Sequence, residues 1–81
     1  MLTTNEYMNL MLNSGYYVSL DADEINVLHD ERIVATVDSE QCFVMDTYND
    51  GFYKLSEENK KYVYQKTKEY AETPLVNRES K

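Results

Sequence analysis

Residues 16–48 have the sequence YYVSLDADEINVLHDERIVATVDSEQCFVMDTY, and this stretch decides the fold. At its start, the apolar residues Tyr16, Val18 and Leu20 alternate with Tyr17 and Ser19, which is typical of a half-buried strand. The connections between its apolar runs are only a few residues long, too short for a parallel crossover. The stretch therefore predicts an antiparallel meander.

The later strands follow from runs of β-forming residues. Residues 25–28 and 32–37 flank the acidic segment 29–31 and predict a hairpin. Asp-Glu is a poorer type I′ pair than Asn-Gly, so a longer loop is the alternative at this turn. A turn at 38–40 then leads to a fourth strand over 42–46.

A helix is predicted on the N-terminal side of this stretch, over Leu2–Asn13. Thr3 and Glu6 have the spacing of a capping box, in which each side chain accepts from the other's backbone N–H. Gly15 follows the last turn, where glycine adopts the left-handed conformation that ends helices.

A second helix is predicted from Glu57 to Glu72, with Ser56 as its N-cap and Pro74 as its stop. Beyond the proline, Leu75 and Val76 are expected to pack back against the core.

Together these elements predict a single α+β domain over residues 1–81, with residues 76–81 expected to fray. The N-terminal helix precedes a three- to four-stranded antiparallel meander, and the C-terminal helix follows it. Both helices are expected on one face of the sheet, which leaves the other face in water.

The charge is divided unequally along the chain. Residues 1–53 sum to −9 and residues 54–81 to +2, which gives the net charge of −7. A surface of this sign repels phosphates and anionic lipid and attracts basic protein surfaces. We therefore expect a protein partner, and neither direct nucleic-acid binding nor a membrane.

No residue pattern predicts catalysis, and we expect a non-enzymatic protein without a cofactor. His29 is the only histidine and stands at a turn, and Cys42 has no other obvious general base. The two glycines lie too far apart for a phosphate-binding loop.

No metal site is expected either. A calcium loop counted from Asp21 has Asn26 where glycine belongs and Arg32 where the bidentate glutamate belongs. The count from Asp46 succeeds at Gly51 and Glu57 but fails at its third position, so weak cation binding there stays an open question.

The chain has one cysteine, so we expect no disulfide framework, and the sequence predicts neither a signal peptide nor a membrane span. This composition predicts a cytoplasmic protein.

The acidic meander and the tyrosines provide the candidate partner-binding residues. Over about 20 Å, B-DNA carries about twelve phosphate charges, and the meander approaches this density within a factor of two. Presentation of a DNA-like surface to a basic groove is one hypothesis, and tyrosine-anchored binding is another. A solvated face without a recognition role and a homodimer are the alternatives. The candidates are Asp21, Asp23, Glu24, Asp30, Glu31, Asp38, Glu40, Tyr17 and Tyr48.

The hairpin INVLHDERIVATVD (25–38), the segment FYKLSEEN (52–59) and the tail EYAETPLVNR (69–78) resemble small, mostly uncharacterised phage and prophage proteins of Gram-positive bacteria. The resemblance covers residues 25–79 and is most specific in the tail, at Tyr70, Ala71, Thr73, Pro74, Leu75 and Arg78. It implies a phage-encoded protein acting in the bacterial cytoplasm. We therefore expect a protein that binds a host or phage partner, with inhibition of a nucleic-acid-handling enzyme as the sharper form. The alternative is a homo-oligomeric phage accessory protein.

Overall fold

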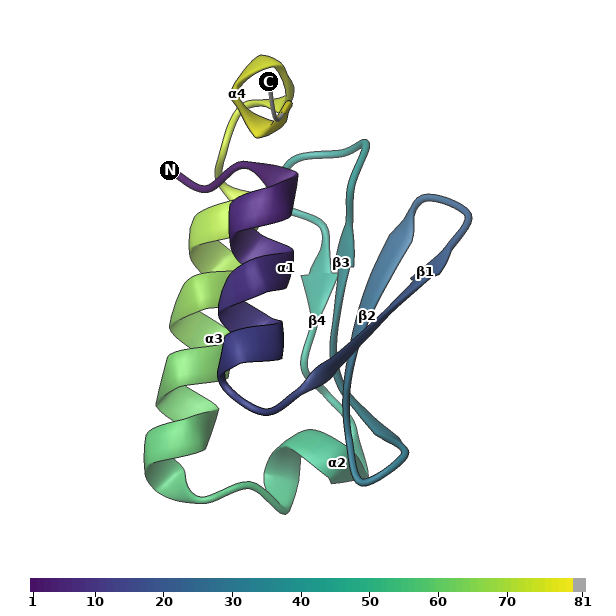
Figure 1. The fold of residues 1–81 in the computed structure, drawn as a ribbon, viewed down its shortest axis with the longest axis vertical. Coiled ribbons are helices and arrows are strands. Elements are labelled where there is room, and N and C mark those ends of the chain that lie inside the picture. Colours follow the sequence, from purple (N-terminus) through teal and green to yellow (C-terminus); the bar gives the residue numbers. More distant parts are fainter. Residues whose placement is uncertain (80–81) are drawn as a thin grey trace.

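The computed structural model describes residues 1–79, and its order of elements confirms the α+β class (Figure 1). Four strands form one antiparallel sheet in chain order, namely β1 (Tyr17–Asp21), β2 (Glu24–His29), β3 (Arg32–Asp38) and β4 (Met45–Asp46). The helices are α1 (Thr4–Asn13), α2 (Asp50–Tyr53), α3 (Glu57–Ala71) and α4 (Leu75–Arg78). The predicted meander between an early and a later helix is therefore present.

Local signals at both ends of α1 act as predicted. The Thr3 hydroxyl accepts from the Glu6 N–H at 3.1 Å, and the Glu6 carboxylate accepts from the Thr3 N–H at 2.9 Å. At the other end Gly15 has φ +92°, its N–H donates to Leu12 O, and the N–H of Tyr16 donates to Met11 O. This pair of bonds is a Schellman motif, which turns the chain into β1.

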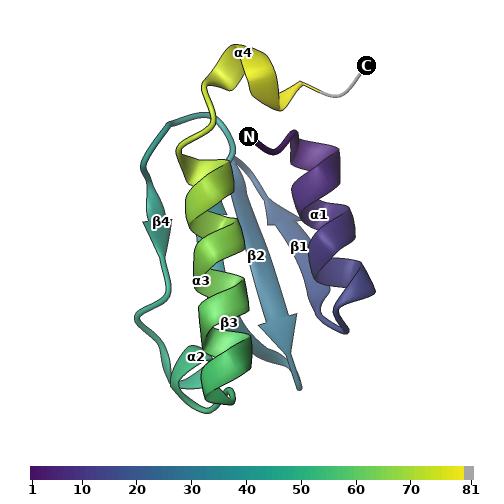
Figure 2. The same cartoon turned by 90° about the vertical axis from the view of Figure 1, so that its left-hand side faces the viewer.

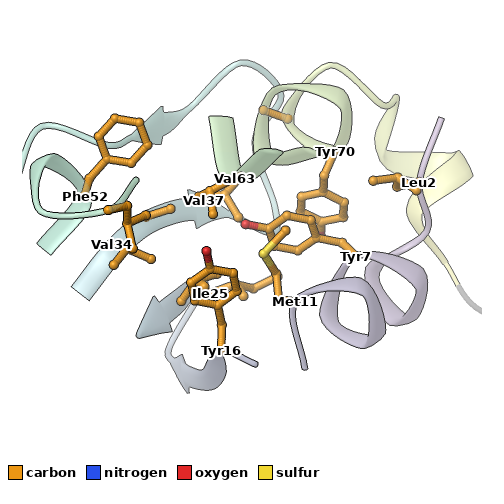
Figure 3. Packing of buried hydrophobic residues seen from close by; sticks show 14 residues of the cluster. Leu2, Tyr7, Met11, Tyr16, Ile25, Val34, Val37, Phe52, Val63 and Tyr70 are labelled. Atoms are coloured by element: carbon orange, nitrogen blue, oxygen red, sulfur yellow. The ribbon is translucent and has the colours of Figure 1, made fainter. Parts of the chain in front are cut away.

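The core lies between the sheet and the two long helices. Figures 1 and 2 show α1 and α3 side by side; α1 contacts β1, and α3 contacts β3 and β4. Inside the core the rings of Tyr7 and Tyr70 stack with centroids 4.9 Å apart (Figure 3). The Tyr7 hydroxyl also shares a hydrogen bond of 2.8 Å with Thr67 Oγ1. The two helices are thus joined by aromatic packing and by a buried hydrogen bond.

A β-bulge interrupts the register of β2 and β3. Val27 pairs with Ala35 and Leu28 pairs with Ile33, so Val34 is the extra residue of β3. Both Val34 and Ala35 are buried, although strict alternation would place one of them on each face. The bulge therefore adds an apolar side chain to the core.

The fourth strand is shorter than the predicted 42–46, because β4 contains only Met45 and Asp46. Phe43 has φ +65°, and its N–H donates to Ala71 O at the end of α3 at 2.8 Å. This contact with a helix removes Phe43 from the ladder.

The prediction that Leu75 and Val76 pack against the core is wrong. They are 43% and 78% exposed, and Arg78 is the buried residue of this segment at 2% exposure. Residues 76–78, expected to fray, belong to α4, and residues 80 and 81 lie outside the described residues. Pro74 separates α3 from α4, as its predicted role as a helix stop requires.

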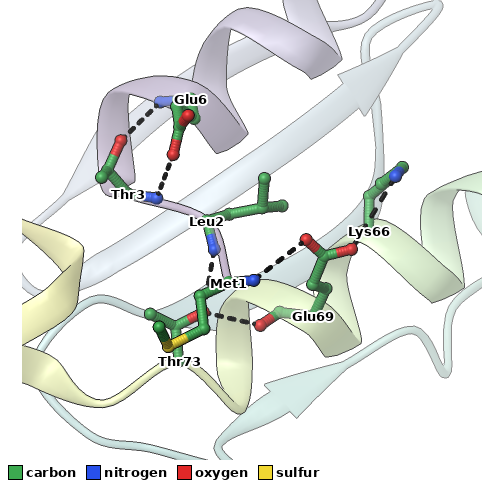
Figure 4. Close-up of polar contacts among 7 residues, drawn as sticks. All are labelled: Met1, Leu2, Thr3, Glu6, Lys66, Glu69 and Thr73. Atoms are coloured by element: carbon green, nitrogen blue, oxygen red, sulfur yellow. Dashed lines mark hydrogen bonds and ion pairs between the residues drawn. The ribbon is translucent and has the colours of Figure 1, made fainter.

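Hydrogen bonds and an ion pair join the N-terminus to the end of α3 (Figure 4). The N–H of Leu2 donates to Thr73 Oγ1 at 3.1 Å, and that hydroxyl donates to Glu69 O at 2.8 Å. The Met1 amino group lies 3.6 Å from the Glu69 carboxylate. The N-terminus is therefore held against the C-terminal end of α3.

Candidate acidic binding surface

The side of the sheet away from the buried Ile25, Val27 and Val37, here called the open face, brings three carboxylates together. Asp21 pairs with Glu24 across β1 and β2, and Glu24 pairs with Asp38 across β2 and β3. Residues directly opposite each other in antiparallel strands have Cβ atoms about 4.5–5.5 Å apart, and like charges at this spacing destabilise the sheet. We call Asp21, Glu24 and Asp38 the acidic row.

The acidic row borders a shallow hollow of about 360 Å³ on the open face. The Thr36 hydroxyl donates to Asn26 Oδ1 at 2.9 Å in its polar middle. The hollow is lined by Asp21, Glu24, Asn26, Ile33, Thr36, Asp38, Val44, Met45 and Asp46. It is thus a mixed surface with carboxylates and apolar side chains.

Asp46 is the acidic member that sequence reasoning did not include in this surface. It pairs with Thr36 across β3 and β4, and it lines the hollow with the acidic row. In the sequence, Asp46 is notable only as the first position of a possible cation-binding loop. Asp46 joins this surface because of the register between β3 and β4, and local turn signals in the sequence do not determine that register.

The acidic row is free of basic partners among residues 1–79. Three of the four lysines of α3 pair with acids of the helix or its C-cap, with Lys60 3.1 Å from Glu57, Lys66 3.8 Å from Glu69 and Lys68 3.7 Å from Glu72. The one buried arginine, Arg78, donates to backbone carbonyls instead. The carboxylates of the row therefore make no ion pair in this part of the chain, and the nearest contact from the positive half is the one from Arg78 to the backbone carbonyl of Asp38.

Two more of the predicted acids lie next to the row. Asp23 is in the β1–β2 turn, where its carbonyl accepts from the Ser39 N–H at 2.7 Å. Glu40 follows β3, and its N–H donates to Asp38 Oδ1 at 2.7 Å. Both residues are exposed. The β1–β2 end of the sheet thus gathers five of the candidate carboxylates.

Asp30 and Glu31 lie at the opposite end of the sheet, in the β2–β3 turn. The six residues of β2 span about 17 Å at the usual rise per residue. The nine candidates therefore do not form one continuous surface.

The two candidate tyrosines are exposed but belong to different places. Tyr17 is 73% exposed and pairs with Leu28, which in turn pairs with Ile33. These three residues form the apolar end of the open face. Tyr48 is 83% exposed beyond β4 and meets Tyr53 edge to face at 5.8 Å.

The residues considered for chemistry have other partners. The His29 ring packs edge-on against Tyr16 at 5.6 Å, with Nε2 3.6 Å from Asp30, and the Cys42 thiol donates to Thr73 O at 3.3 Å. Asp46 Oδ1 accepts from the Tyr48 N–H at 2.7 Å. No group of three or more His, Cys, Asp or Glu side chains in residues 1–79 is placed to hold a metal ion.

No family model, curated protein or solved structure matches this chain. The resemblance to phage proteins stays a prediction from the quoted residues. Within residues 1–79, the helices are too short or too polar to span a membrane.

Proposed function

We propose that the protein is a binding module whose open face takes a basic surface of a protein partner. The observation that carries this proposal is the acidic row, in which Asp21, Glu24 and Asp38 lie on adjacent strands and their carboxylates make no ion pair in the described chain.

The energetics of the row favour binding of positive charge. Three carboxylates on neighbouring strands repel one another, and cationic side chains placed over them replace this repulsion by attraction. Because the row is solvated, its main contributions are a faster encounter and the selection of basic partners.

The neighbouring apolar side chains support a protein as the partner. The open face continues from the row to Tyr17 and Ile33, which are 73% and 43% exposed. An amphipathic basic segment would place its cations over the row and its apolar side chains over this end.

Mimicry of DNA is the sharper form of the proposal. Four carboxylates lie on the open face, whereas about 17 Å of B-DNA carries about ten phosphates. Because the open face carries fewer than half the charges of DNA of this length, it suits a compact basic patch on the partner better than a long DNA-binding groove. The resemblance of residues 25–79 to phage proteins supports a bacterial host protein as the partner, which makes the protein a non-enzymatic modulator in the host cytoplasm.

The test compares two triple variants of equal charge change. Asp21→Asn/Glu24→Gln/Asp38→Asn removes the row, and Glu57→Gln/Glu58→Gln/Glu72→Gln removes three charges from α3. The probe is a fluorescent amphipathic peptide of lysine and leucine, measured by anisotropy at about 50 and about 200 mM NaCl. We expect the row variant to bind about tenfold more weakly at low salt, with a flatter salt dependence.

Equal weakening by both triple variants would contradict a site at the row and indicate binding to net charge alone. Tyr17→Ala tests the apolar end, and a larger effect of this variant than of the row variant indicates tyrosine-anchored binding. DNA mimicry is tested by competition, in which the protein and a labelled DNA duplex compete for a histone-like DNA-binding protein. If the protein does not displace the duplex, DNA mimicry is rejected but binding of a basic protein surface is not.

A further inference from the structure

The outer edge of β1 is unpaired in the described structure. The sheet order is β1-β2-β3-β4, so β1 has only β2 as a neighbour. Natural edge strands are usually protected by proline, lysine, a bulge or a covering element. The sequence of β1, YVSLD, contains neither proline nor lysine, and its one charged residue, Asp21, stands at the end of the strand next to the turn. The bulge of this sheet lies between β2 and β3.

The ladder determines which backbone groups lie along this edge. Asp21 and Glu24 flank a two-residue turn and form the closing pair of the hairpin. Pairs in an antiparallel ladder alternate between hydrogen-bonded and non-hydrogen-bonded. The pair that closes a two-residue hairpin turn is hydrogen-bonded, so Tyr17, Ser19 and Asp21 direct their N–H and C=O groups toward β2. The alternate residues Val18 and Leu20 therefore direct theirs toward the free edge.

Leu20 marks the place where the edge is uncovered. It pairs with Ile25, which pairs with the buried Val37, so its side chain belongs to the core side of the sheet. It is nevertheless 65% exposed, whereas Ile25 is 1% exposed. Figure 1 shows β1 diverging from α1 toward the β1–β2 turn, which accounts for the exposure.

We propose that this edge pairs with the β1 edge of a second copy of the chain, antiparallel, with a two-fold axis at Ser19. In this register Val18 lies opposite Leu20 of the second copy, and the outward backbone groups of both residues exchange hydrogen bonds. Ser19 lies opposite its own copy, at a non-hydrogen-bonded pair where a small residue suits the close approach of about 4.5 Å between Cα atoms.

The same register is favourable for side chains and for charge. Leu20 gains Val18 as an apolar neighbour on the core side, and Tyr17 comes opposite Asp21 on the open face. Because the strands are antiparallel, the two acidic rows are displaced by four residues, about 13 Å, along the strand direction. Both open faces lie on the same side of an eight-stranded sheet, so the site proposed above stays accessible.

The first test is the concentration dependence of mass and of amide exchange in the full chain. Sedimentation equilibrium is expected to show a dimer at high concentration. Salt is expected to favour it, because each copy has a net charge of −7. On dimerisation the amides of Val18 and Leu20 become protected from hydrogen exchange, whereas those of Tyr17 and Ser19 change little. A monomer at about millimolar concentration overturns the proposal, as does protection at any other element.

The second test compares two substitutions with the same charge change. Leu20→Lys is expected to weaken the dimer at least about tenfold, and Val76→Lys, at a 78% exposed position on α4, is expected to leave it unchanged. Val18→Pro removes an outward N–H and is expected to act like Leu20→Lys. A dimer unaffected by both edge variants contradicts the proposal. The opposite salt dependences of dimerisation and basic-peptide binding separate failure of this proposal from failure of the proposed function.

Discussion

Arg78 shows how one buried cation organises the C-terminal segment. Its Nε donates to Thr73 O at 3.0 Å, Nη2 donates to Ala71 O at 2.9 Å, and Nη1 donates to Asp38 O at 2.8 Å. The guanidinium also lies 4.4 Å from the centroid of the Tyr70 ring. The last carbonyls of α3 have no intrahelical donors, so a cation here satisfies them and complements the helix dipole.

Replacement of Arg78 by lysine tests this arrangement. An ammonium group keeps the charge but cannot span carbonyls from α3 and β3 in one plane or stack on Tyr70. We expect Arg78→Lys to lower the free energy of unfolding by about 2–3 kcal/mol in urea denaturation. Arg32→Lys, at an exposed position, is the control and should change it by less than about 0.5 kcal/mol. Equal stability of both variants would show that the planar hydrogen bonding is unimportant.

The same residue explains an error of the sequence prediction. Hydrophobicity placed Leu75 and Val76 in the core, because an arginine without a carboxylate partner is rarely buried. The structure buries Arg78 because carbonyls at the end of α3 and in β3 converge on one point. This convergence is a tertiary property, and no local pattern in the tail contains it.

At the scale of elements, the β2–β3 turn departs most from its preferred chemistry. Asp30 and Glu31 have φ of +51° and +66°, and His29 pairs with Arg32, so a two-residue turn of type I′ geometry connects the strands. The alternative of a longer loop is wrong. Glutamate is poorly suited to the left-handed region because its Cβ approaches the following carbonyl.

Glycine at position 31 should relieve this strain. We expect Glu31→Gly to raise the free energy of unfolding by about 0.5–1 kcal/mol, with the loss of chain entropy partly offsetting the relief of strain. Glu31→Gln removes the same charge without changing the backbone preference, and it should leave stability nearly unchanged. Equal effects of both variants in thermal unfolding would assign the change to charge rather than to backbone strain.

Elements with local end signals were predictable, and those fixed by distant contacts were not. The capping box and Gly15 delimit α1, and Ser56 and Pro74 delimit α3, all within a few residues in sequence. The bulge at Val34 and the short β4 depend on partners in other elements. Only the register of three strands reveals that Asp21, Glu24 and Asp38 form a row.

At the scale of the whole molecule, the candidate carboxylates lie at the surface of the sheet, whereas Arg78 is a buried charge. The sequence predicted an acidic meander from its composition, and the structure divides its candidates between the two ends of the sheet. The core is a cluster of buried apolar side chains, and neutral polar contacts such as the Tyr7–Thr67 hydrogen bond lie within it. Stability should therefore respond to alkaline pH through the buried tyrosine.

Tyr7 connects global stability to alkaline pH. Burial raises the pKa of its hydroxyl from 10.0 to about 12; the hydrogen bond from Thr67 opposes the shift, and the neighbouring Tyr70 adds to it. Because the folded pKa lies above the unfolded one, the neutral phenol contributes stability that is complete below pH 10. This contribution is lost as pH rises through about 12. Burial also raises the pKa of Tyr16, which acts in the same direction.

We expect the free energy of unfolding to fall between about pH 10 and 12, with Tyr7 contributing up to about 1.4 kcal/mol per pH unit. Tyr7→Phe lacks the titrating hydroxyl and leaves the buried Thr67 hydroxyl without this partner, so it should be less stable at neutral pH by about 1–3 kcal/mol. Its alkaline slope should nevertheless be flatter, because the largest raised pKa is removed and the raised pKa of Tyr16 remains. Urea denaturation at several pH values measures both effects. Parallel slopes for the two proteins would mean that Tyr7 ionises as readily in the folded chain as in the unfolded one, and would contradict the pKa that burial raises.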